Sequence, residues 1–229
     1  MRIMNCISGL KNKLVSNQTQ YRKVKFGICK GCYLPINLRH QFRNFIGFYE
    51  PEIIKYIKFY VQPGSCCYDI GASVGYYSMA FSKLASPGKI YAVEADVKFC
   101  SQLKNTISRN VLHDSEIKIL NYLIADVVDM PNRKVTIDYL VFDKKYTPPN
   151  LVKMDIEGAE YLAFLGAINV IRKYFPKIIV EVHSEELKEK CQLLLEREGY
   201  KVTIVNQNNF FPLRSLPYNG WLCGEKRTG

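Results

Sequence analysis

The chain has 229 residues, of which 48 % are hydrophobic and 23 % are charged, which is the composition of an ordinary globular protein. This length can form a large α/β domain whose core needs no disulfide or metal. No run approaches the roughly 18 uninterrupted apolar residues of a membrane span. The eight cysteines are too few for a disulfide scaffold. We therefore expect a reduced, intracellular protein located in the cytoplasm.

The formal net charge of +11 is concentrated near the N-terminus. Residues 1–49 contain nine Lys or Arg and no Asp or Glu, whereas the remainder has 23 basic and 21 acidic residues. We predict a basic N-terminal extension over residues 1–48 and a nearly neutral domain over residues 49–229. Such asymmetry is typical of contact with a nucleic acid, an anionic membrane or an acidic partner, or of a merely solvated basic face.

Two patterns stand out within the extension. Ile3, Ile7, Leu10 and Leu14 have the spacing of an amphipathic helix, so peripheral contact with an anionic membrane through residues 1–25 is one prediction. Cys29-Lys30-Gly31-Cys32 lacks the second cysteine pair that a structural zinc site needs. We interpret these cysteines as ordinary residues of a hairpin.

From residue 51 onward, the pattern alternates between helices and strands. Pro51 opens a predicted helix over residues 51–61. Six predicted strands and four predicted helices follow: strands Cys66–Ile70, Lys89–Val93, Ile117–Leu123, Leu151–Met154, Lys177–Val182 and Tyr200–Val205, and helices 75–85, 96–109, 157–174 and 184–198. A proline-containing insertion, with a short strand at Lys134–Ile137, occupies residues 124–150, and Trp221–Cys223 is predicted to return antiparallel. The alternation predicts an α/β fold with a mostly parallel sheet.

The junction between the first strand and the next helix carries the most informative motif. It reads Asp69-Ile70-Gly71-Ala72-Ser73-Val74-Gly75, so an acid precedes two glycines spaced G-x-x-x-G. A dinucleotide loop has three glycines and a helix N-terminus facing a pyrophosphate. An acid at this position repels phosphate and suits a cation, which favours S-adenosylmethionine. Asp69, Gly71, Ser73 and Gly75 are therefore candidate cofactor residues.

Acidic residues after the next two strands extend this site. Glu94 ends the second strand, where an acid can accept hydrogen bonds from ribose hydroxyls. Ala125 and Asp126 follow the third strand and are predicted to flank the adenine amino group. We also assign Glu50, with Tyr49, a role in closing over the methionine end of the cofactor.

Four segments make the sequence resemble the FkbM-type methyltransferases, a family of class I (Rossmann-like) S-adenosylmethionine-dependent enzymes. The resemblance covers about residues 45–205 and departs from the usual pattern at Ser73, where the family has Asn. The segments are Gly47-Phe48-Tyr49-Glu50-Pro51-Glu52, Asp69-Ile70-Gly71-Ala72-Ser73-Val74-Gly75-Tyr76-Tyr77, Val152-Lys153-Met154-Asp155-Ile156-Glu157-Gly158-Ala159-Glu160 and Ile179-Val180-Glu181-Val182-His183.

The resemblance implies a seven-stranded sheet of order 3-2-1-4-5-7-6 with the seventh strand antiparallel. It also implies methyl transfer to oxygen, often on a sugar or polyketide hydroxyl. We therefore expect an O-methyltransferase that acts on a glycan or another small hydroxylated acceptor.

The catalytic candidates lie where the fourth and fifth predicted strands end. Asp155, Glu181 and His183 should meet at the edge of the sheet, and Glu157 follows closely. His183 is the natural base because of its intrinsic pKa, with Asp155 orienting the hydroxyl or acting as the base instead. Asp155, Glu181 and His183 also resemble a weak divalent-metal site, an alternative that we leave open without favouring it.

Two alternative functions remain at this stage. A 2′-OH RNA methyltransferase would use the basic extension as a docking arm; the sequence Asp155-Ile156-Glu157-Gly158 differs from the N-P-P-Y-like motif of amino-directed enzymes. A non-catalytic cofactor-binding module that docks on a membrane or partner is the third hypothesis.

Overall fold

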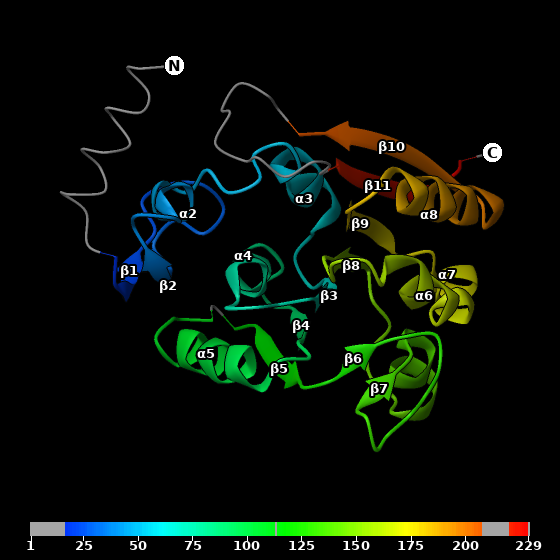
Figure 1. The fold of residues 1–229 in the computed structure, drawn as a ribbon, viewed down its shortest axis with the longest axis horizontal. Helices are drawn as coiled ribbons and strands as arrows, with labels where there is room; N and C mark the ends of the chain where they lie inside the picture. The colour runs from blue at the N-terminus through cyan, green and yellow to red at the C-terminus, as the bar shows by residue number, and fades with distance from the viewer. Residues whose placement is uncertain (1–16, 113, 208–219, 229) are drawn as a thin grey trace.

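A seven-stranded sheet forms the centre of the protein in this computed structural model, which describes residues 17–112, 114–207 and 220–228 (Figure 1). Its strands, in spatial order, are β10 (Tyr200–Asn206), β11 (Gly220–Lys226), β9 (Lys177–Val182), β8 (Leu151–Met154), β3 (Cys66–Ile70), β4 (Lys89–Val93) and β5 (Glu116–Leu120). β11 runs opposite in direction to the other six strands of this sheet. Numbered along the chain within this sheet, the strands read 3-2-1-4-5-7-6, so both the fold class and the strand order agree with the prediction.

The two faces of the sheet have separate hydrophobic cores, as strand alternation requires. Along β3, Tyr68 and Ile70 pack into the core under α6 (Glu160–Leu165), α7 (Ile168–Tyr174) and α8 (Glu185–Arg197). Cys67 packs into the opposite core under α3 (Ile54–Tyr60) and α4 (Tyr76–Leu84). Figure 1 shows these two groups of helices on opposite sides of the sheet, with α5 (Val97–Ser108) beside α4.

Several predicted elements differ in their bounds from those in the structure. The predicted helix 157–174 is divided into α6 and α7 at Gly166, where a Cβ would lie 2.2 Å from the carbonyl oxygen of Ala125. The predicted strand Ile117–Leu123 ends as β5 at Leu120. Beyond it, Asn121 turns back, and its side-chain amide donates to the carbonyl of Glu94 over 2.8 Å. The helix predicted from residue 51 begins at Ile54.

The insertion forms a small layer beside β8. Its short strands β6 (Leu123–Ile124) and β7 (Lys134–Val135) pair in parallel, and a π-helical turn follows at Tyr139–Asp143. Ile124 and Val135 are buried, so this layer extends the core under α6 and α7.

The described part of the basic extension packs closely against the domain. It contains the hairpin β1 (Thr19–Lys23) and β2 (Tyr33–Asn37) and the short helix α2 (Phe42–Ile46). Its buried residues share one core with α4, and Cys29, in the hairpin loop, donates its thiol to the Tyr76 carbonyl over 3.1 Å. The hairpin interpretation of Cys29 and Cys32 is therefore confirmed. The boundary at residue 48 stays a prediction.

The helix predicted from Ile3 to Leu14 lies outside the described residues, so membrane contact through residues 1–25 also stays a prediction. Within the part of the chain that is described, no helix combines the length and apolarity needed to cross a bilayer.

The turn after β3 depends on a close backbone approach. Gly71 has a φ of +79°, and a Cβ there would lie 1.9 Å from the carbonyl oxygen of Asp155. A glycine is required here because the backbone at Asp155, just after β8, comes this close. The contact brings the loop after β3 against the loop after β8.

Replacing Gly71 by Ala should therefore be much more harmful than replacing another left-handed glycine. Gly31 has a φ of +90° with open space around its Cβ position, so Gly31→Ala should cost about 1–2 kcal/mol. Gly71→Ala adds a backbone clash and should cost more than about 3 kcal/mol. Urea unfolding followed by circular dichroism measures both losses, and equal losses would contradict the role given to this contact.

Candidate active site

Polar residues of the α3/α4 face gather where the parallel strands end. Asp69 pairs with Lys153 in the register of β3 and β8, and Glu181 lies on the same face of β9. All three side chains are buried in a face that is otherwise apolar. Burying charged groups is unfavourable unless they are paired, so their concentration at one edge marks a functional site.

Asp69 has one satisfied and one unsatisfied carboxylate oxygen. Ser78, on α4, donates its hydroxyl to Asp69 Oδ2 over 2.6 Å. Oδ1 is buried and has no hydrogen-bond partner among the described residues. Desolvation raises the pKa of Asp69, and Lys153 opposes that shift. A hydrogen-bond donor on a ligand would satisfy Oδ1, as predicted for a cofactor-binding acid.

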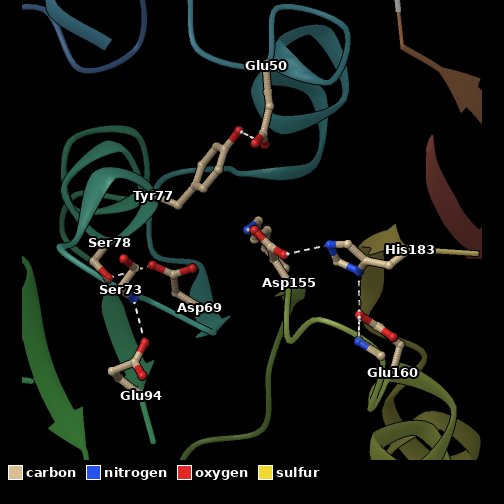
Figure 2. A network of polar contacts seen from close by, with 11 residues as sticks. Glu50, Asp69, Ser73, Tyr77, Ser78, Glu94, Asp155, Glu160 and His183 are labelled. Carbon is tan, nitrogen blue, oxygen red and sulfur yellow. Dashed lines mark hydrogen bonds and ion pairs between the residues drawn. The ribbon is translucent and has the colours of Figure 1, made fainter. Parts of the chain in front are cut away.

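Glu94 supports the glycine-containing loop from the neighbouring strand. Its carboxylate accepts the backbone N–H of Ser73 over 2.8 Å (Figure 2). It also accepts the backbone N–H of Asp96 over 2.8 Å. Ser73 has a φ of +48°, a left-handed conformation that this hydrogen bond helps to hold. The structure thus gives Glu94 a loop-holding role, while ribose binding stays a prediction.

A cavity of about 510 Å³ lies in front of this loop. Six of the predicted site residues line it: Tyr49, Glu50, Asp69, Gly71, Ser73 and Asp155. The wall also includes Lys153 from β8, Tyr76 and Tyr77 from α4, and residues 39–44 around α2. The other candidates, Gly75, Glu94, Ala125, Asp126, Glu181 and His183, are not part of its lining.

Ala125 and Asp126 are placed away from the cavity. Ala125 is buried against Gly166, and its N–H donates to the carbonyl of Val135 over 2.9 Å, whereas Asp126 is exposed. The physical reason is the early end of β5, after which Asn121 occupies the place next to Glu94. The adenine contact assigned to these two residues gains no support from the cavity and stays a prediction.

Glu50 reaches the cavity from the loop before α3. It is 4 % exposed and accepts the phenolic hydrogen of Tyr77 over 2.6 Å. Burial and the neighbouring Glu50 carboxylate raise the pKa of Tyr77, so this phenol stays a donor. Glu50 is thus fixed at the cavity wall, in agreement with its predicted position.

His183 lies between two carboxylates at the end of β9. Its Nδ1 is 3.0 Å from Glu160 Oε1, and its Nε2 is 3.5 Å from Asp155 Oδ1 (Figure 2). The hydrogen bond with Glu160 raises the pKa of His183 despite its partial burial. Because both ring nitrogens face carboxylates, the imidazolium is favoured, and His183 is suited to orienting Asp155. Asp155, which lines the cavity, is the better placed base.

The residues that could hold a divalent metal ion differ from the predicted set. Among the described residues, the group able to offer a metal three ligand atoms within 4.8 Å of one another is Glu50, Asp155 and Glu181. Glu50 therefore replaces His183 in the predicted set. Lys153 lies against this group, with Nζ 3.5 Å from Asp155 Oδ2.

Sequence reasoning missed three residues of the site: Lys153, Tyr77 and Ser78. Lys153 lies two residues before Asp155, so strand alternation alone puts both on the same face. Ser78 was read only as part of a helix, and Tyr77 only as part of that helix and of a family segment. No local pattern indicates their long-range carboxylate partners.

Residues 114–202 match the family model described as the methyltransferase FkbM domain. The match covers less than half of the chain. It contains β5, β8 and β9 and therefore Asp155, Glu181 and His183. The matched model and the solved structures described below are those of methyltransferases. No curated protein sequence matches the chain.

Solved structures of several methyltransferases are similar to this one. The methyltransferase FkbM of Methylobacillus flagellatus matches with a TM-score of 0.54 at 20 % identity, over 69 % of this chain and 43 % of that one. A SAM-dependent O-methyltransferase of Thermotoga maritima matches with a TM-score of 0.54 at 11 % identity, over 80 % of this chain and 68 % of that one. The tRNA m1G37 methyltransferase of M. jannaschii matches with a TM-score of 0.54 at 18 % identity, over 93 % of this chain and 59 % of that one. At these identities the likeness concerns the fold.

The contact of His183 with Glu160 predicts how the stability of the protein varies with pH. The folded-state pKa of His183 is raised, so its stabilising contribution is fully present below the unfolded value of about 6.5 and is lost as the pH rises through the folded value. The loss of unfolding free energy caused by His183→Gln should therefore be largest near pH 6 and shrink toward pH 9. Urea unfolding across this range tests it, and a loss that grows with pH would contradict it.

Proposed function

We propose that the chain is an S-adenosylmethionine-dependent O-methyltransferase that methylates a hydroxyl of a glycan or another small hydroxylated acceptor. The observation that carries this proposal is Asp155: its carboxylate lines the cavity, 24 % exposed, beside the glycine-containing loop. The FkbM domain match supports the reaction class, and the glycan acceptor rests on the family resemblance of the sequence.

The residues around the cavity fit this cofactor. S-adenosylmethionine carries an ammonium, a sulfonium and no phosphate, so it suits a wall that contains Asp69, Asp155 and Glu50. The buried Oδ1 of Asp69, which lacks a partner among the described residues, is a ready acceptor for an ammonium N–H. Asp69 would hold the amino group, and Glu94 would keep Ser73 and its loop in place.

When bound, S-adenosylmethionine supplies an electrophilic methyl group on a sulfonium sulfur. The chain must align the acceptor hydroxyl with that methyl group and take up the hydroxyl proton. Asp155 can do both, because a carboxylate oxygen accepts the O–H hydrogen bond and then the proton. A carboxylate is basic enough, since a hydroxyl becomes strongly acidic as its oxygen gains a new bond to carbon.

His183 and Lys153 prepare Asp155 for this role. His183 approaches Oδ1 and Lys153 approaches Oδ2, each at 3.5 Å, so the carboxylate is held from both sides. Glu160, a buried residue at the start of α6, fixes the far nitrogen of His183. Held this way, Asp155 keeps one orientation toward the cavity, which is the main contribution that a positioned base can make.

A second candidate, RNA 2′-OH methylation, is favoured by one observation. Arg39, His40 and Arg43 line the cavity, so its outer wall is basic while its floor is acidic. Phosphate groups next to the target nucleotide would suit such a wall. The same wall suits an anionic glycan, so it does not distinguish the two candidate functions. They are distinguished by the methylated product that each would form.

Radiolabelled methyl transfer into a fractionated cell extract tests the proposal. We expect the wild-type chain to label an acceptor whose methyl group is found on oxygen by mass spectrometry. Asp155→Asn should lower the rate at least about 100-fold, because it removes the proton acceptor. Asp126→Asn, which alters an exposed acid outside the cavity, should leave the rate unchanged.

Three outcomes would count against the glycan proposal. Label that is destroyed by ribonuclease, and whose formation falls steeply with salt, would transfer the assignment to RNA. Label on nitrogen or carbon would contradict O-methylation. Binding of S-adenosylmethionine without any labelled product would support the non-catalytic alternative.

A further inference from the structure

Lys153 is a buried ammonium at the centre of an acidic cluster. Its side chain is 2 % exposed, and β8 places it directly opposite Asp69 on β3. Its Nζ lies 3.5 Å from Asp155 Oδ2 and 4.6 Å from the centre of the Tyr77 ring. A lysine is almost never buried this deeply unless anionic groups pair with it.

The carboxylates around Lys153 would repel one another without a cation. Glu50, Asp155 and Glu181 offer oxygen atoms that all lie within 4.8 Å of one another, and Glu50 and Glu181 are buried. Oxygen atoms at that spacing are the surroundings that divalent cations prefer. The fold thus concentrates negative charge at one point, and that charge needs a positive counterpart.

Tyr77 links the ammonium to the far side of the cluster. Its ring face lies toward Lys153, and its hydroxyl donates to Glu50. The negative face of the ring stabilises the ammonium, and the hydroxyl fixes a carboxylate that also surrounds it. Residues from β8, α4 and the loop before α3 therefore converge on a single charged group. Desolvation lowers the pKa of Lys153, but the surrounding carboxylates raise it overall, consistent with a permanent ammonium.

We propose that Lys153 is the built-in cation of the Glu50, Asp155 and Glu181 cluster and takes the place that a divalent metal ion would otherwise occupy. It acts as a positioning residue: its charge lets the carboxylates stand close together and holds Asp155 toward the cavity. This role would make the proposed methyl transfer independent of a metal ion. Only the part that concerns Asp155 in catalysis rests on the proposed function.

Metal titration tests the proposal without any knowledge of the acceptor. Mn²⁺ is added to the full chain and followed by electron paramagnetic resonance, which distinguishes free from bound ions. The wild-type chain should bind no Mn²⁺ at this cluster at millimolar concentration. Lys153→Met, which keeps the length of the side chain and removes its charge, should bind Mn²⁺ at least tenfold more tightly than the wild type.

A matched control separates this effect from the simple loss of a lysine. Lys118 also lies on a tyrosine face, with Nζ 4.6 Å from the centre of the Tyr146 ring, but outside the three-carboxylate group. Lys118→Met should not create Mn²⁺ binding. Lys153→Arg, which keeps the positive charge, should also remain free of Mn²⁺. Adding Glu181→Gln to Lys153→Met should abolish the new binding.

Each result decides the inference. Mn²⁺ binding to the wild-type cluster, lost in Glu181→Gln, would overturn it, as would a folded Lys153→Met variant that binds no Mn²⁺. If Lys153→Met fails to fold, the double variant Lys153→Met/Glu181→Gln should recover native circular dichroism, because it contains one fewer repelling carboxylate. Failure to recover would also overturn the inference. None of these readouts needs methyl transfer, so failure of the proposed function remains a separate result.

Discussion

One ammonium among several carboxylates, buried at the end of a parallel sheet, is the interaction on which the site depends. Strand alternation places Asp69, Lys153 and Glu181 on one face, and the parallel register brings their strand ends together. Burying any of these charges alone would be costly, whereas burying them as a hydrogen-bonded group is tolerable. The arrangement leaves more acids than bases at the cavity floor, which suits a cationic cofactor.

The N-terminal segment takes part in this arrangement. Its hairpin shares a core with α4, the helix that carries Tyr77 and Ser78, and Glu50 follows α2 directly. The basic residues around α2 line the same cavity as the buried acids Glu50 and Asp69. The positive charge that first suggested a separate docking arm is therefore located in part at the entrance of the site, where it bears on the choice of acceptor.

Much of the fold could be predicted because local patterns determine it. The bounds of β3, β4, β8 and β9 agree with the strands expected from apolar runs, and the loop motif located the cavity. Predictions failed where long-range packing decides. The helix is divided at Gly166, which packs against the carbonyl of Ala125, and β5 ends early, where Asn121 binds the Glu94 carbonyl.

The same limit applies to the chemistry. Intrinsic pKa made His183 the natural base, but its two carboxylate neighbours come from the loop after β8 and from α6, and no sequence spacing reveals them. Lys153 could have been recognised from its i, i+2 relation to Asp155. Tyr77 could not, because its partner Glu50 is 27 residues away.

The central claim is that the acids at this edge of the sheet hold S-adenosylmethionine, and calorimetric titration of the cofactor into matched variants tests it most directly. Asp69→Asn removes the charge at the buried, unsatisfied oxygen and should weaken binding at least about tenfold, or about 1.4 kcal/mol. Asp126→Asn changes an exposed acid outside the cavity and should bind as the wild type does. Equal affinity of all three proteins, or a loss confined to Asp126→Asn, would contradict the account.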